Sequence, residues 1–238
     1  MPNVLSKPKI LFEVHGSSHT TKRRKMPDIM CDVFSCQNRY AMPIFERDPR
    51  FDHGGRMLTG ESVVYNFIGG RRVKVFTRDS VVYDLLKRMH DKSPYQQVNM
   101  VMLGANDLGS GIVSNRFLRR FFSCLERLIE QSVVIPNNHL VICSLVPRPK
   151  TSHQSDGLFK GVDQEMKWIC QRNSQSVSFF DVSSLLRDQN GNILREYFLP
   201  DLTHLTEEAV KLVCDAALRF VMLIDGDRIW QPSLTLDA

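Results

Sequence analysis

The chain has 238 residues, of which 42% are apolar and 24% are charged, proportions that fit one globular domain with a single core. No run approaches the ~20 apolar residues of a membrane-spanning helix, and residues 1–9 lack the apolar segment of a secretory signal. The six scattered cysteines fit a reduced, intracellular protein, cytoplasmic or nuclear, and they lack the ligand spacing of a zinc site. We therefore expect no membrane span, no metal and no cofactor.

The formal net charge of +5 is unevenly distributed along the chain. Residues 1–90 carry a net charge of +7, and the remainder carries −2. The excess lies in two basic clusters: Lys22, Arg23, Arg24 and Lys25, and Arg71, Arg72 and Lys74. Such asymmetry indicates an anionic partner, RNA or another polyanion. A solvated surface or a nuclear-import signal explains it equally well.

The amino-terminal part begins with an apolar run, residues 9–14, that precedes a glycine and predicts a buried strand followed by a tight turn. Residues 20–72 are rich in Pro, Gly, Arg and Asp and show no helical period. We expect an irregular basic insertion or cap there, with one strand at Val63–Ile68, or a partly disordered segment. Loops of this length in compact domains tend to be functional or mobile.

From residue 73 onward, apolar runs typical of buried strands alternate with amphipathic helical segments. The expected strands are 73–76, 98–103, 139–145 and 177–182, and the expected helices are 81–89, 117–129, 159–170 and 207–223. Thr206 is the expected N-cap of the last helix, which has two acids in its first turn. This alternation predicts βαβ units around a parallel sheet in one domain spanning residues 1–238.

Three short motifs follow strands or precede a helix, where α/β proteins place their chemistry. They contain Ser18 after the first strand, Gly104 and Asn106 after a middle strand, and Asp201 and His204 before the last helix. Ligands bind outside the carboxyl ends of parallel strands, so these residues could meet at one edge of the sheet. Simpler interpretations stay open, because serine caps helices and asparagine is common in turns.

Together these residues would supply the groups of a serine hydrolase. His204 would take the proton from Ser18 Oγ, because an unassisted hydroxyl is a poor nucleophile near neutral pH. Asp201 would hold the imidazole tautomer and stabilise the imidazolium. The Asn106 amide, with backbone N–H groups near Ser18 and Gly104, would stabilise the oxyanion. Loss of one such donor typically costs ~10²–10³ in rate.

The order of the motifs resembles that of the SGNH (GDSL-type) hydrolase superfamily, over residues 8–20 and 73–223. The resemblance implies a flavodoxin-like three-layer α/β/α sandwich with a central parallel sheet, and esterase or lipase activity on acyl or acetyl esters. On the family's pattern Ser18 is the nucleophile, His204 the base, Asp201 the orienting acid and Asn106 the oxyanion donor. Esterase domains of this superfamily also occur in the first open reading frames of some retrotransposons.

The chain departs from the family's pattern in two places. The nucleophile motif reads Gly16-Ser17-Ser18 where the family usually has Gly-Asp-Ser. The family also takes an oxyanion N–H from a glycine after the second strand. If that strand is 73–76, Arg78 or Asp79 occupies the position, and under a shifted alignment Gly69 or Gly70 fills it.

Two hypotheses follow from these observations. The first is an intracellular serine esterase that acts on a small acyl or acetyl ester. The second is a non-catalytic relative that binds RNA through its basic amino-terminal half. The OSK domain of the insect protein Oskar is such a relative.

Overall fold

The computed structural model describes residues 10–16, 43–46, 56–59, 63–68, 79–91, 96–102, 104–108, 113–150, 153–173 and 175–226. The strands are β1 Ile10–Gly16, β2 Pro43–Glu46, β3 Arg56–Thr59, β4 Val63–Ile68, β5 Gln96–Met102, β6 Asn138–Cys143 and β7 Val177–Phe180. The helices are α2 Asp79–Asp91, α3 Ala105–Leu108, α4 Asn115–Ser132, α5 His153–Gln171, α6 Val182–Leu185 and α7 Glu207–Gly226, with a short 3-10 helix at Arg195–Tyr197.

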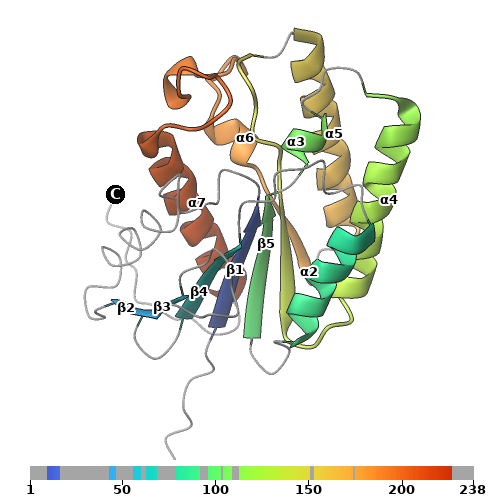
Figure 1. Cartoon of the computed structure of the whole chain (residues 1–238), viewed down its shortest axis with the longest axis vertical. Coiled ribbons are helices and arrows are strands. Elements are labelled where there is room, and N and C mark those ends of the chain that lie inside the picture. Colours follow the sequence, from blue (N-terminus) through green and yellow to red (C-terminus); the bar gives the residue numbers. More distant parts are fainter. Residues whose placement is uncertain are drawn as a thin grey trace, which may run out of the picture.

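The strands form one sheet in the order β2-β3-β4-β1-β5-β6-β7 (Figure 1). From β4 to β7 every neighbouring pair is parallel, whereas β2 and β3 pair antiparallel at the edge beside β4. Strand β1, first in the chain, therefore lies inside the sheet between β4 and β5. This arrangement confirms the expected parallel sheet and adds an antiparallel edge to it.

Helices cover both faces of the sheet, and each face has its own apolar core. Along β5, Met100 and Met102 belong to the cluster that includes α6 and α7, whereas Val101 belongs to the cluster that includes α2, α4 and α5. Successive side chains of a strand point to opposite faces, so one strand supplies both cores. Figure 1 shows α7 on one side of the sheet and α2, α4 and α5 on the other. The three-layer α/β/α sandwich expected from the resemblance is confirmed.

The predicted elements agree with the observed ones within three residues at each end, except that α5 begins at His153, six residues before its predicted start. The strands predicted at 63–68, 98–103, 139–145 and 177–182 are β4, β5, β6 and β7, and the helices predicted at 81–89, 117–129, 159–170 and 207–223 are α2, α4, α5 and α7. The predicted N-cap is also confirmed, because Thr206 Oγ1 accepts a hydrogen bond from Ala209 N at 3.3 Å. The strand predicted at 73–76 lies outside the described residues.

Strands β2 and β3 were not predicted, because both lie in the 20–72 segment that shows no sustained pattern. Each has only four residues, too few for alternation to stand out from the surrounding Pro, Gly and Arg. They extend the sheet beyond β4, so this part of the segment is an edge of the sheet. No helix among the described residues is both long and apolar enough to cross a membrane.

Candidate active site

The carboxyl ends of β4, β1 and β5 lie side by side in the sheet. His15 of β1 pairs with Ile68 at the end of β4, and Gly16 pairs with Met102 at the end of β5. Neighbouring strands lie about 4.8 Å apart, so the chain leaves these three strands at adjacent points. The sequence motifs at 16–18 and 104–107 therefore follow adjacent strand ends at one edge of the sheet.

The strand pairing also shows which strand lies beside β1 on the side away from β5. The strand beside β1 is β4, which ends at Ile68 and is followed in sequence by Gly69 and Gly70. Asp79 instead begins α2, where its carboxylate accepts a hydrogen bond from Arg127 of α4. The residues that follow this neighbour of β1 in sequence are therefore Gly69 and Gly70, and a role for either as an oxyanion donor remains a prediction.

Gly104 makes the turn from β5 into α3. Its φ of 105° lies in the left-handed region that favours glycine, and its carbonyl accepts the hydrogen bond from Leu108 N at 3.1 Å that closes α3. A Cβ at this position would lie 2.9 Å from Phe121 and 3.0 Å from Leu145, closer than side chains tolerate. Asn106 lies in α3, and its side chain is outside what the structure describes.

Asp201 and His204 are in direct contact in the loop before α7. Asp201 Oδ2 lies 2.6 Å from His204 Nδ1, and Asp201 Oδ1 accepts hydrogen bonds from the backbone N–H groups of His204 at 2.9 Å and Thr203 at 3.0 Å. Because an ionised carboxylate only accepts, Nδ1 carries the imidazole proton when the ring is neutral. Nε2 is then the ring atom with a lone pair, as a general base requires.

The loop that carries this pair is held at both ends. His204 O accepts a hydrogen bond from Leu199 N at 2.7 Å, and Thr206 N donates to Tyr197 O at 2.9 Å. Leu205, the residue after the histidine, is buried in the core on the α7 face. The backbone of His204 is therefore held in place, and its side chain is 21% exposed.

The hydrogen bonds to Asp201 also set its charge. Desolvation raises the pKa of this carboxyl, but hydrogen bonds from the His204 side chain and from the backbone N–H groups of His204 and Thr203 lower it by more. The pKa of Asp201 therefore lies well below its usual range. The carboxyl is ionised at every pH at which a histidine base could work, and it can stabilise an imidazolium beside it.

The remaining predicted site residues lie outside the described residues: Ser18, Lys22, Arg23, Arg24, Lys25, Arg71, Arg72 and Lys74. The structure thus shows the Asp201–His204 contact and the Gly104 turn, and the catalytic roles of these residues remain predictions. Within the part of the chain that the structure describes, no group of three or more His, Cys, Asp or Glu residues could hold a metal ion.

Comparison with known proteins found likeness in structure alone. No family model matches the sequence, and no curated protein matches it. Among solved structures, an acetyl xylan esterase from Geobacillus stearothermophilus matches with a TM-score of 0.58 and 12% identity, over 90% of this chain and 94% of that chain. A GDSL-like lipase from Bacteroides thetaiotaomicron matches with a TM-score of 0.53 and 11% identity, over 95% of this chain and 93% of that chain. At such low sequence identities the likeness establishes the fold, and any activity has to be argued from the residues of the site.

Proposed function

Because the chain has the fold of the SGNH (GDSL-type) hydrolases, we propose that it is a serine esterase whose triad is Ser18, His204 and Asp201. The observation that carries the proposal is the 2.6 Å contact between Asp201 Oδ2 and His204 Nδ1. It orients the imidazole and places the ring proton on Nδ1, so that Nε2 carries the lone pair of a base. An Asp–His pair three residues apart also fits a purely local turn, so the nucleophile has to be tested directly.

In the proposed reaction, Ser18 Oγ attacks the carbonyl carbon of the ester and His204 Nε2 takes the hydroxyl proton. The oxyanion accepts hydrogen bonds from the Asn106 amide and from backbone N–H groups near Ser18 and Gly104, with Gly69 or Gly70 a further donor. The alcohol leaves with the proton from His204, and water then hydrolyses the acyl-enzyme by the same route in reverse. Asp201 stays ionised throughout.

The proposed substrate is a short acyl or acetyl ester. The matched acetyl xylan esterase and GDSL-like lipase both support an ester as the substrate class. The groups in the proposed site are those of acyl transfer: a nucleophile, a base with its orienting acid, and oxyanion donors. All of these groups act on the ester bond itself, and none of them selects a particular alcohol.

The decisive experiment measures hydrolysis of p-nitrophenyl acetate by the full chain, together with covalent labelling by a fluorophosphonate. Ser18→Ala should abolish both turnover and labelling. Ser17→Ala is the matched control, because it removes the adjacent hydroxyl, and it should keep both. Turnover that survives Ser18→Ala would refute the assignment of the nucleophile.

RNA binding is the second candidate, and the net charge of +7 on residues 1–90 favours it. Neutralising Arg71, Arg72 and Lys74 should abolish binding, and the affinity of the wild-type chain should fall steeply with salt because bound counterions are released. Neutralising three exposed arginines of α4, Arg116, Arg119 and Arg120, is a control that removes the same charge elsewhere. Equal loss of affinity in both variants would argue against a specific site at 71–74.

A further inference from the structure

Asp163 of α5 makes a contact that the proposed triad does not use. Its Oδ1 accepts a hydrogen bond from Leu145 N at 2.7 Å. Leu145 lies two residues beyond the end of β6, where the chain leaves the carboxyl edge of the sheet. The bond therefore ties the middle of α5 to the segment that leaves β6.

Leu145 in turn packs against the turn between β5 and α3. Its side chain is buried, and its Cδ2 would lie 3.0 Å from a Cβ at Gly104. Phe121 of α4 is equally close to the same point. Gly104 thus lies between two large side chains, and the position of one of them is fixed by the hydrogen bond to Asp163.

We propose that Asp163 is a positioning residue that holds the Gly104 turn, and through it Asn106, in place to stabilise the oxyanion. The Asp163 carboxyl oxygen fixes the backbone of Leu145, the Leu145 side chain supports Gly104, and Gly104 precedes the helix that carries Asn106. The catalytic consequence rests on the proposed esterase function, whereas the mechanical coupling of Asp163 to the turn does not.

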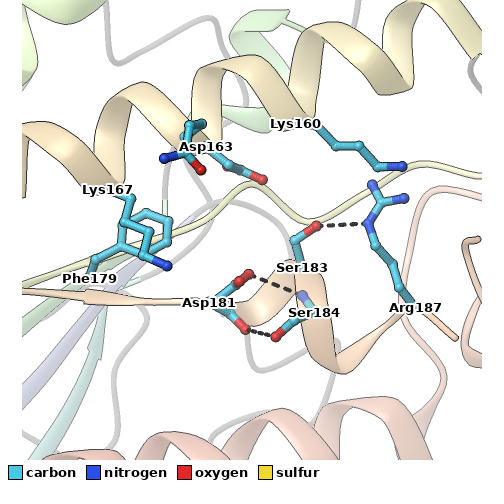
Figure 2. A pocket seen from close by; sticks show the side chains of 9 residues that line it. Lys160, Asp163, Lys167, Phe179, Asp181, Ser183, Ser184 and Arg187 are labelled. Carbon is cyan, nitrogen blue, oxygen red and sulfur yellow. Dashed lines mark hydrogen bonds between the residues drawn. The ribbon is translucent and has the colours of Figure 1, made fainter. Parts of the chain in front are cut away.

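Asp163 also lines a cavity of about 250 Å³ between α5, the end of β7 and α6. Figure 2 shows Asp163 on the α5 side of this cavity, across from Asp181, Ser183 and Ser184. Asn has nearly the same shape as Asp, and the cavity gives the larger Leu side chain room, so both can occupy the position without overpacking. Asn keeps an oxygen acceptor for Leu145 N, and Leu does not.

The test combines kinetics and amide hydrogen exchange on the full chain, with Asp163→Leu and Asp163→Asn made in the wild-type and the Asn106→Ala backgrounds. In the wild-type background, Asp163→Leu should lower kcat about tenfold with little change in KM, because the loss falls on transition-state stabilisation. Asp163→Asn should restore most of kcat. In the Asn106→Ala background, Asp163→Leu should have no further effect, because a lost donor cannot be mispositioned.

Hydrogen exchange separates this proposal from the proposed function. Asp163→Leu should speed exchange at residues 104–108, and Asp163→Asn should not. If the wild-type chain has no esterase activity, the proposed function fails, and the exchange comparison still decides whether Asp163 holds the turn. Unchanged exchange at 104–108, or a kcat loss that persists in full in Asn106→Ala, would overturn the proposal. If Asp163→Leu does not fold, Leu145→Val decides the same point, because it shortens the side chain against Gly104.

Discussion

At the scale of single residues, the Asp201–His204 pair is a local structure with a chemical use. A carboxylate that accepts backbone N–H groups two and three residues ahead is a common turn, and here the histidine at the third position turns its Nδ1 to the same carboxylate. The backbone bonds hold the Asp201 carboxylate still. The side-chain bond then determines which imidazole nitrogen carries the proton.

Asp201→Asn should lower kcat by about 10³–10⁴-fold and leave KM nearly unchanged, because the amide favours the wrong imidazole tautomer and cannot stabilise an imidazolium. Steady-state kinetics on a p-nitrophenyl ester measure both constants. Asp188→Asn is a matched control, because Asp188 also accepts backbone N–H groups, from Asn190 and Asn192, in a turn outside the proposed triad. Equal loss of kcat in both variants would mean that Asp201 acts only through the turn.

Gly104→Ala should lower the free energy of unfolding by about 2–4 kcal/mol, because alanine is strained at a φ of 105° and its Cβ would meet Phe121 and Leu145. Gly161→Ala is the opposite case. Gly161 lies in α5 with open space around it, so the substitution should raise the free energy of unfolding by about 0.5–1 kcal/mol. Urea denaturation measures both values. If Gly104→Ala leaves the free energy of unfolding unchanged, the turn can move to accommodate the added methyl group without cost.

At the scale of the element, α7 connects the site to the core. Its inner face carries Ala209, Val210, Val213 and Cys214 into the core on the α6 and α7 face. Its N-cap, Thr206, is two residues from His204. The helix that contributes to the core therefore also anchors the loop of the proposed base.

Thr206→Ala should cost about 1 kcal/mol in unfolding free energy, because it removes the acceptor for Ala209 N. It should also lower kcat severalfold by loosening the backbone beside His204. Ser114→Ala removes the corresponding cap of α4, where Ser114 Oγ accepts from Phe117 N at 3.2 Å, and should cost similar stability with a smaller effect on kcat. Denaturation and kinetics on both variants make the comparison. If Thr206→Ala lowers kcat no more than Ser114→Ala does, the Thr206 cap does not contribute to the positioning of His204.

At the scale of the whole molecule, the sheet brings together the chain's distant parts. The proposed groups come from residues 18, 104–106 and 201–204, and the proposal requires the fold to bring them together at the carboxyl edge of the sheet. In Figure 1, α3 and the start of α7 lie at the end of the sheet toward which β1 and β5 point. The same layers bury Asp163 enough to couple its charge to the stability of the domain.

Desolvation, with a smaller contribution from the Asp181 carboxylate, raises the pKa of Asp163 to about 7 against the lowering effect of the hydrogen bond from Leu145 N. Arg187 lowers this pKa and Asp156 raises it, both to a smaller extent. Between about pH 4 and pH 7 the native state thus holds a proton that the unfolded chain releases, so stability should fall as the pH rises through this window.

Asp163→Asn should remove this dependence. Its unfolding free energy relative to wild type should grow by up to about 4 kcal/mol from pH 4 to pH 7 and stay level above that range. Chemical denaturation at a series of pH values measures the difference. A difference that is constant with pH would mean that the Asp163 carboxyl titrates in the native state as it does in the unfolded chain.

The elements with strong local patterns and the order of the motifs could be predicted from the amino-acid sequence. The apolar runs of β5 and β6, the amphipathic stripe of α4, the Thr206 cap and the Asp201-x-x-His204 spacing all depend on neighbours within about four residues, which a local pattern records. The tertiary structure was needed to show that β2 and β3 join the sheet, that β4 lies beside β1, and that Asp163 accepts a hydrogen bond from Leu145, whose side chain lies next to Gly104. These contacts join residues far apart in the chain, and strand register and core packing, which have no local signature, select them.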